Sequence, residues 1–235
     1  MLKALIFDVD GTLADTESAH RAAFNKAFAE VGRDWVWDEP TYVNLLEVSG
    51  GKERILHYWQ QAQPDLKALD GMVVQDMVAR MHELKTAAYE RAVQEGSVLL
   101  RPGVLRLIEA AHQGGLQLAI ATTTSPVNIS ALLRTAIGPD WAQYFVVVED
   151  ASTAPIKKPH PQVYMQTLAR LNVRAADCVA FEDSGNGLKA ALAAGLPTVI
   201  TPNSFTEHHN FTGALRVLPS LLDVTVARLR EWHGR

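Results

Sequence analysis

Short apolar runs that each end in polar residues constrain the fold of this chain more than any other feature. Strands buried in a parallel sheet are apolar along their length, and the connections between them are usually helices. Most of the runs are separated by helical patterns, which lie at residues 103–113, 126–136, 161–171 and 185–194. The pattern therefore predicts an α/β fold with a parallel sheet, whose candidate strands are residues 2–9, 116–121, 145–148, 179–181 and 198–200.

The stretch from residue 15 to residue 97 interrupts this alternation. It has no convincing strand pattern, and its helical patterns lie at residues 17–31, 40–47, 52–62 and 71–95. Arg101-Pro102-Gly103 then marks the return to alternating structure. We therefore expect a core domain of residues 1–14 and 98–235, and a helical domain of residues 15–97 inserted after the first strand. Trp35 and Trp37 are expected to pack inside the helical domain.

Composition argues against several classes of function. A formal net charge of −4 disfavours a nucleic-acid partner, because binding to a phosphate backbone requires a basic face. The single cysteine, Cys178, excludes an internal disulfide bond, and its apolar neighbours predict a buried thiol. No apolar stretch approaches the roughly 20 residues that span a bilayer, and residues 1–7 are too short for a secretion signal. We expect a cytoplasmic, monomeric protein with no membrane partner.

Charged or hydroxyl residues follow the apolar runs. The first run leads into Asp8-Val9-Asp10-Gly11-Thr12, the run at 116–121 into residues 122–125, and the run at 179–181 into residues 182–185. Lys157 and Lys158 precede the helical pattern that begins near residue 161. In open parallel sheets, ligands bind at the carboxyl ends of the strands. We therefore expect these residues to converge on one site.

The residue types at these positions suit phosphoryl transfer. Asp8 and Asp10 are two residues apart, so a strand would direct both side chains to the same side. Asp8 can attack phosphorus to form an acyl phosphate, which divides a difficult displacement into two easier steps. Asp10 can protonate the leaving oxygen and later accept a proton from water. Gly11 would permit the tight exit from the strand.

A divalent cation and hydrogen-bond donors would complete this site. Mg²⁺ prefers oxygen ligands, which Asp8, the Asp10 carbonyl and Asp183 would supply. The transferring phosphoryl group also needs donors on its other side. The Thr122 hydroxyl and the Thr123 amide can donate hydrogen bonds, and Lys158 supplies a cation.

Each of these features alone has a simpler explanation. The Asp8–Gly11 turn can be a solvated strand exit, the threonines can cap a helix, Lys158 can be surface charge, and Glu182-Asp183 can be an acidic helix start. Because all four features follow predicted strands of one chain, a functional site is favoured over four unrelated local features. A phospho-acceptor signalling domain would use similar groups, but it would lack the helical insert. A catalytically inactive binding protein is disfavoured because no position of these motifs lacks its expected residue.

With these motifs, the chain resembles the haloacid dehalogenase superfamily over essentially its full length. Asp8–Thr12 is similar to the family's first motif, Thr122 to the second, Lys158 to the third and Glu182-Asp183 to the fourth. The resemblance implies a Rossmann-like doubly wound parallel sheet with an inserted all-helical cap. It also implies a Mg²⁺-dependent phosphoric monoester hydrolase with Asp8, Asp10 and Asp183 at the metal.

Within the superfamily, the chain resembles the branch that contains β-phosphoglucomutase and the CbbY sugar-bisphosphate phosphatases. Two segments carry this likeness, Gly50-Gly51-Lys52-Glu53-Arg54-Ile55 in the cap and Ala121-Thr122-Thr123-Thr124-Ser125 in the core. Glycines followed by Lys52 and Arg54 at a helix start can bind an anion through amides, the helix dipole and two cations. We therefore expect a second substrate phosphate there, although an exposed helix start with solvated charges would show the same pattern.

The branch also implies substrate contacts and a substrate. Glu17 would accept hydrogen bonds from sugar hydroxyls, and His20 would either assist cap closure or pack as a neutral hinge residue. His208 and His209 are expected on the surface. The implied reaction converts xylulose 1,5-bisphosphate, an inhibitory by-product of Rubisco chemistry, to xylulose 5-phosphate. A phosphosugar mutase and another sugar-phosphate or phosphoglycolate phosphatase remain alternatives, because they would use the same aspartates.

Overall fold

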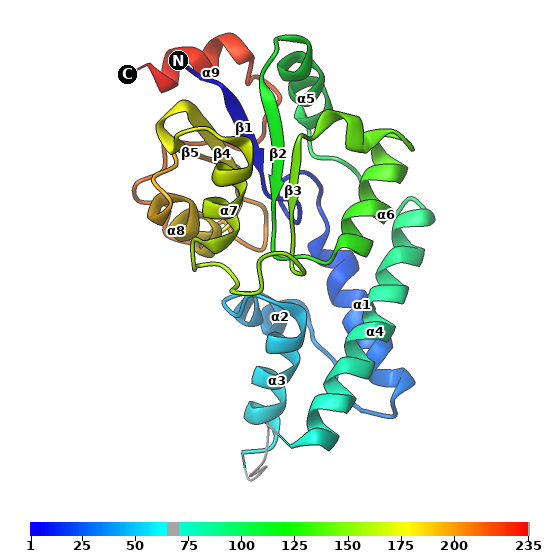
Figure 1. Ribbon diagram of the computed structural model, residues 1–235. Helices are drawn as coiled ribbons and strands as arrows, with labels where there is room; N and C mark the ends of the chain where they lie inside the picture. Colours follow the sequence, from blue (N-terminus) through cyan, green and yellow to red (C-terminus); the bar gives the residue numbers. More distant parts are fainter. Residues whose placement is uncertain (65–70, 235) are drawn as a thin grey trace.

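Six parallel strands form one sheet in the computed structural model, which describes residues 1–64 and 71–234. The strand order is β3-β2-β1-β4-β5-β6, with β1 inside the sheet (Figure 1). The strands are β1 (Ala4–Phe7), β2 (Gln117–Ala121), β3 (Val147–Glu149), β4 (Cys178–Glu182), β5 (Thr198–Ile200) and β6 (Arg216–Val217). The order of the strands along the chain reverses at β1, which pairs with β2 on one side and β4 on the other. Ligands bind at such a reversal in open α/β sheets.

The strands are apolar because helices cover both faces of the sheet. Leu5 and Phe7 pack in one cluster with residues of α5 (Val104–Gln113) and α6 (Pro126–Ala136). Ala4 and Ile6 point to the other face and pack with residues of α7 (Gln162–Leu171) and α8 (Gly185–Ala193). This alternation within one continuous apolar run is what a strand buried on both faces requires. The predicted parallel sheet is confirmed.

The residues between β1 and β2 include four helices that lie beyond the carboxyl ends of the strands (Figure 1). They are α1 (Glu17–Glu30), α2 (Glu39–Leu45), α3 (Gly51–Ala62) and α4 (Met72–Gln94). Aromatic side chains pack among them, and Trp37 is fully buried while Trp35 is 9% exposed. The predicted packing of both tryptophans is confirmed. Residues 65–70 of the expected helical domain lie outside the described residues.

Helix α4 also joins the helical insert to the core. It packs along α1 over much of its length and contacts α6 beside the sheet. Tyr89 and Val93 of α4 belong to the same apolar cluster as Leu5 and Phe7 of β1. None of the helices in the described part of the chain is both long and apolar enough to cross a membrane.

Some elements differ from the sequence expectations. The first strand ends at Phe7 rather than Val9, because the Val9 carbonyl accepts the backbone N–H of Leu13 in a turn. The run expected at 145–148 forms its strand at Val147–Glu149. The two-residue edge strand β6 and the terminal helix α9 (Val226–His233) were not predicted. The thiol of Cys178 is buried, as expected.

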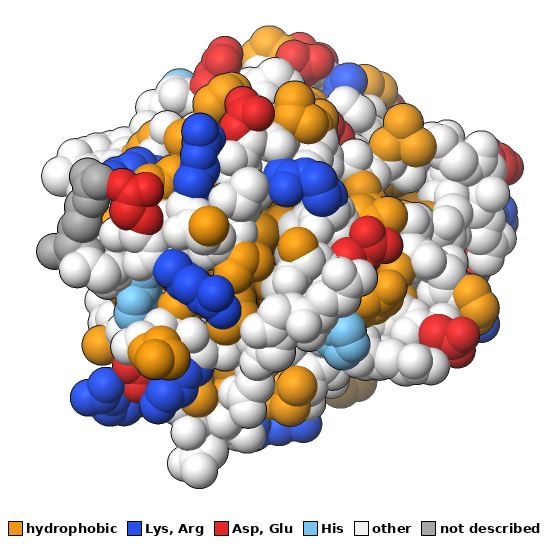
Figure 2. All heavy atoms as spheres, turned by 90° about the horizontal axis from the view of Figure 1, so that it is seen from above, with side chains coloured by type: hydrophobic (Ala, Val, Ile, Leu, Met, Phe, Trp, Pro, Cys, Tyr) orange, Lys and Arg blue, Asp and Glu red, His pale blue; other side chains and the backbone are white. Residues whose placement is uncertain are grey.

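The end of the molecule that carries both termini has a mixed surface. Viewed from that end in Figure 2, Lys and Arg side chains are interspersed with Asp, Glu and hydrophobic side chains. This face therefore lacks the concentration of positive charge that a nucleic-acid backbone would need.

Candidate active site

A cavity of about 430 Å³ lies at the carboxyl ends of the strands, between the sheet and the helical insert. Every residue that the sequence analysis placed in the site lines it. The core contributes Asp8, Asp10, Thr122, Thr123, Thr124, Lys158 and Asp183, and the helical insert contributes Glu17, Gly50, Gly51, Lys52 and Arg54. Because β1 ends at Phe7, Asp8 is the first residue past the strand and its side chain stands at the floor of the cavity.

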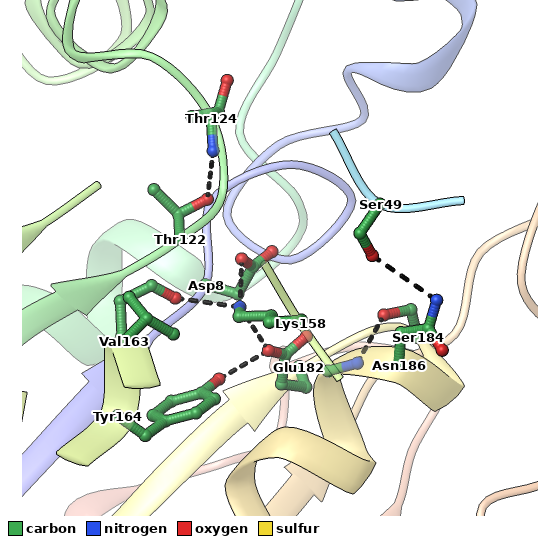
Figure 3. Close-up of polar contacts among 12 residues, drawn as sticks. Asp8, Ser49, Thr122, Thr124, Lys158, Val163, Tyr164, Glu182, Ser184 and Asn186 are labelled. Carbon is green, nitrogen blue, oxygen red and sulfur yellow. Dashed lines mark hydrogen bonds and ion pairs between the residues drawn. The ribbon is translucent and has the colours of Figure 1, made fainter. Parts of the chain in front are cut away.

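Lys158 holds the carboxylate of Asp8 (Figure 3). Its Nζ donates to Asp8 Oδ1 at 2.7 Å, to Glu182 Oε1 at 2.5 Å and to the Ala121 carbonyl at 2.9 Å. Tyr164 donates its hydroxyl proton to the same Glu182 oxygen. Burial raises the pKa of Asp8 to about 7, against the attraction of Lys158 and with the repulsion of Glu182. Lys158 thus orients the Asp8 carboxylate, but burial makes the ionised form of Asp8 energetically unfavourable in the metal-free protein.

Three buried carboxylates form a group that suits a divalent cation. Oxygens of Asp8, Glu182 and Asp183 lie within 4.8 Å of one another. Burial raises the pKa of Asp183, and repulsion from Asp8 and Glu182 adds to the effect. One buried lysine does not neutralise this group, and hard oxygen ligands are those that Mg²⁺ prefers. The residues therefore fit Mg²⁺, with Asp8 and Asp183 as side-chain ligands and Glu182 already bound to Lys158 and Tyr164.

The Asp10 side chain turns away from that group toward the helical insert. His20 Nε2 lies 2.9 Å from Asp10 Oδ1, and Lys85 Nζ lies 2.8 Å from His20 Nδ1. Because Lys85 can only donate, Nδ1 accepts and Nε2 carries the proton that binds Asp10. Burial alone would raise the pKa of Asp10, but His20 and Lys85 outweigh burial and hold it at about 2. Burial and Lys85 lower the pKa of His20, against the attraction of Asp10.

Lys85 is a site residue that the sequence analysis missed. Its side chain is 5% exposed and points from α4 into the cavity. Burial lowers the pKa of Lys85 to about 8. A signal for it existed, because Lys85 occupies a helical position in phase with Val78, Met81 and Ala88, which are apolar and buried. A lysine on the apolar face of a helix indicates a specific partner.

The start of α3 forms the outer end of the cavity. Gly50 has φ of 98°, which glycine adopts without strain, and the Glu53 carboxylate folds back against it. Arg54 donates to the Leu45 carbonyl at 3.0 Å and to the Tyr42 hydroxyl at 3.2 Å. Lys52 also lines the cavity. The residues of the predicted anion site therefore lie together at this end of the cavity, with Arg54 partly engaged by the protein itself.

Two further side chains of the insert shape the cavity. The Tyr42 hydroxyl donates to Glu17 Oε2 at 2.7 Å and so orients that carboxylate. His82 of α4 packs against Gly51, where an added Cβ would lie 2.7 Å from its Nε2. Burial lowers the pKa of His82 to about 4, with smaller effects from Lys85 and Lys52, so His82 is neutral beside these cations.

The threonine segment after β2 is held by its own hydroxyl groups. The Thr124 amide donates to Thr122 Oγ1 at 3.4 Å (Figure 3), and Asn128 donates to Thr124 Oγ1 at 3.2 Å. Ser125 caps α6 by accepting the Asn128 amide. The cap of α6 is therefore Ser125 and not one of the threonines, and Thr122, Thr123 and Thr124 line the cavity.

One expectation near the site is wrong. His209 was expected on the surface, but its side chain is only 9% exposed and lines the cavity. Its Nδ1 accepts the Gly185 amide, so Nε2 carries a proton and faces Glu47 Oε1 at 3.4 Å. Glu47, His209 and the exposed His208 are close enough to hold a metal ion, but a protonated Nε2 has no lone pair to bind one.

The core and the insert also meet at Asn186 on α8. Its Nδ2 donates to the Glu47 carbonyl at 3.0 Å. The same group also donates to Ser49 Oγ at 3.4 Å (Figure 3). These bonds attach the segment before α3 to the core. Asn186 was not predicted from the sequence, because an asparagine in a helix carries no signal of a distant partner.

Comparisons with known proteins agree with this fold and site. The family model of haloacid dehalogenase-like hydrolases matches residues 2–195. The plasmid CbbY protein of Cupriavidus necator is 51% identical over 248 residues, which cover 99% of this chain and 97% of that protein. The crystal structure of CbbY from Rhodobacter sphaeroides in complex with phosphate has a TM-score of 0.90 and 41% identity, and covers 98% of this chain and 100% of that chain.

A second crystal structure shows a variant of the same CbbY in complex with xylulose-(1,5)bisphosphate. Its TM-score is 0.89 at 41% identity, over 97% of this chain and 98% of that chain. The fold and the site thus define a phosphatase of the α/β class. The chain belongs to the haloacid dehalogenase-like hydrolase family, and within it the chain is similar to the CbbY proteins. The predicted family, fold and enzyme class are confirmed.

Proposed function

We propose that this protein is a Mg²⁺-dependent sugar-bisphosphate phosphatase that hydrolyses xylulose 1,5-bisphosphate to xylulose 5-phosphate. The observation that carries the proposal is one cavity lined by lysines from both the core and the helical insert. Asp8, Lys158 and the neighbouring carboxylates lie at its core end, and Lys52 and the start of α3 lie at its outer end. A substrate with a phosphate at each end matches this distribution of charge. The xylulose-(1,5)bisphosphate complex of the similar CbbY supports the choice of sugar.

In the first step of the proposed reaction, an Asp8 carboxylate oxygen attacks phosphorus and the bond from phosphorus to the sugar oxygen breaks. Lys158, the Thr122 hydroxyl and the Thr123 amide hold the phosphoryl group. Bound Mg²⁺ would neutralise charge on the attacking carboxylate and the phosphate, and would favour the ionised form of Asp8. Lys158 keeps one Asp8 oxygen fixed, which leaves the other for attack.

Asp10 supplies and removes the protons. In the first step it donates a proton to the leaving sugar oxygen, and in the second it accepts one from the water that attacks the acyl phosphate. Its pKa of about 2 in the presence of His20 is too low for an acid. A substrate dianion close to Asp10 would raise that pKa by repulsion. We therefore infer that Asp10 leaves His20 and becomes an acid when substrate occupies the cavity.

The outer end of the cavity selects the substrate in this proposal. Residues 15–97 act as a cap, whose Lys52 and Gly50-Gly51 amides bind the second phosphate. Glu17, oriented by Tyr42, accepts hydrogen bonds from sugar hydroxyls. The Glu53 carboxylate, which lies against Gly50, has to move away when the phosphate binds there.

Phosphate release from a panel of substrates tests this proposal. The panel contains xylulose 1,5-bisphosphate, ribulose 1,5-bisphosphate, xylulose 5-phosphate, β-glucose 1-phosphate and phosphoglycolate, each with Mg²⁺ and with a chelator. We expect Mg²⁺-dependent release, with kcat/KM for xylulose 1,5-bisphosphate at least about tenfold above that for the monophosphates. Formation of a phosphosugar isomer without phosphate release would instead identify a mutase, and a preference for phosphoglycolate would contradict the assigned substrate.

A further inference from the structure

We propose that Arg101 is a positioning residue of this phosphatase, which holds in place both the turn after Asp10 and the loop that orients Asp183. Arg101 lies on the segment that returns from the helical insert to α5. Its backbone N–H donates to the Leu13 carbonyl at 2.9 Å, and the neighbouring Leu100 pairs with Ala14. Arg101 therefore lies where the chain passes from the core into the insert and where it returns from the insert to the core.

The guanidinium group of Arg101 binds backbone carbonyls of two loops next to the candidate site. Nη1 donates to the Gly11 carbonyl at 2.6 Å, and also to the carbonyl and hydroxyl oxygens of Thr201. Nη2 donates to the Pro202 carbonyl at 2.7 Å. The side chain is 7% exposed, and its Nε lies 3.3 Å from Asp15, whose own side chain is 64% exposed. The planar fork thus spans the turn after β1 and the loop after β5.

These two loops meet at the carboxylate of Asp183. Asn203, which follows Pro202, donates from Nδ2 to Asp183 Oδ2 at 2.8 Å. An added Cβ at Gly11 would lie 2.7 Å from Asn203 Nδ2 and would overlap the Asp183 carboxylate. Gly11, Asn203 and Asp183 are therefore in direct contact. A shift of either carbonyl that Arg101 holds would displace Asp183 or the turn that carries Asp10.

Burial of this cation is explained better by positioning than by stability alone. A buried guanidinium loses its hydration. In the described structure its partners are mainly neutral carbonyl oxygens and a solvent-exposed carboxylate. The arrangement fixes the relative positions of the two loops, because an arginine fork presents several donors in fixed directions. Lysine at this position would keep the charge but could not reach both loops at once. The roles of Asp10 and Asp183 rest on the proposed function, whereas the contacts of Arg101 do not.

Arg106, which is exposed, provides a control for the loss of carbonyl contacts alone. It lies on α5, and its Nη2 donates to the carbonyls of Leu221, Leu222 and Val224, which lie away from the cavity. Arg106→Ala therefore removes a similar set of carbonyl contacts without touching Gly11 or Pro202. The variants Arg101→Lys, Arg101→Ala and Arg106→Ala would be compared with the unchanged protein in three measurements: thermal unfolding, Mn²⁺ binding by calorimetry, and steady-state phosphate release.

We expect both Arg101 variants to lose at least about tenfold in kcat, with a smaller change in KM, and to bind Mn²⁺ at least about threefold more weakly. Guanidinium at millimolar concentration should restore part of the kcat of Arg101→Ala by filling the space that the side chain leaves. Arg106→Ala should lower the unfolding temperature while keeping kcat and Mn²⁺ affinity.

Arg101 variants that unfold at lower temperature but retain kcat and Mn²⁺ affinity would overturn the proposal. If Arg101→Ala does not fold, Arg101→Lys decides, since it retains the charge and much of the volume. If the unchanged protein releases no phosphate from any ester, the proposed function fails, but Mn²⁺ binding to the variants still tests whether Arg101 positions the carboxylates.

Discussion

At the scale of single residues, the protonation of Asp8 makes a prediction about stability. Its pKa is about 7 in the folded metal-free protein and 3.8 in an unfolded chain. Between these values folded Asp8 binds a proton that unfolded Asp8 releases, so the contribution of Asp8 to stability falls as the pH rises from about 4 to about 7. Asp183, whose pKa burial also raises, acts in the same direction, whereas His20 and His82, whose pKa values burial lowers, act in the opposite direction. The contribution of Asp8 is therefore the difference between the unchanged protein and Asp8→Asn.

The corresponding measurement is chemical denaturation of the metal-free protein across that pH range. Relative to Asp8→Asn, the unchanged protein should lose up to about 4 kcal/mol of unfolding free energy between pH 4 and pH 7. Added Mg²⁺ should restore stability at pH 7, because a ligand that binds only the folded state stabilises it. An unchanged pH dependence in Asp8→Asn would show that Asp8 is not the group that titrates.

At the scale of secondary-structure elements, the start of α3 makes a prediction about selectivity. Lys52→Ala should raise KM for xylulose 1,5-bisphosphate at least about tenfold, because a charge-assisted hydrogen bond to the second phosphate is lost. KM for a monophosphate should change less than about twofold. Lys26→Ala is the matched control, since Lys26 is an exposed lysine of α1 that does not line the cavity. Equal losses for both substrates would remove the argument for a second phosphate site.

The elements also explain what could be predicted from the sequence. The helix at 126–136 was predicted at its observed bounds, because Ser125 and Pro126 are a strong start signal. The two residues of β6 form a strand only by pairing with β5, which no local pattern encodes. The turn that ends β1 is closed by a local bond from the Leu13 N–H to the Val9 carbonyl, but the apolar pattern continues to Val9 and hides it. Likewise, Asp8 and Lys158 follow recognisable motifs, whereas Asn186 and Arg101 acquire their contacts only in the folded chain.

At the scale of the whole molecule, the contact between α8 and the insert predicts a role for Asn186. Asn186→Ala removes the hydrogen bonds to Glu47 and Ser49, which attach the segment before α3 to the core. Exposed hydrogen bonds of this kind contribute about 1 kcal/mol each. If they favour the closed cap, KM should rise about three- to tenfold while kcat is largely retained.

Gln61→Ala is the control for this experiment. Gln61 lies on the exposed face of α3 and bonds to His57 within the same helix. Gln61→Ala should leave kcat and KM unchanged, and Gln61→Ala and Asn186→Ala should unfold at similar temperatures. A KM for Asn186→Ala equal to that of the unchanged protein would show that these bonds do not contribute to cap closure.

The most direct test of the proposed function follows the phosphate through a single turnover. Xylulose 1,5-bisphosphate carrying radioactive phosphate at C1 is mixed with excess enzyme and Mg²⁺, quenched in acid at short times, and treated with borohydride, which reduces an aspartyl phosphate to homoserine. The proposal predicts transient label on the protein, homoserine at position 8, and then labelled inorganic phosphate together with xylulose 5-phosphate. Inorganic phosphate formed without any labelled protein, or label on a residue other than Asp8, would contradict it.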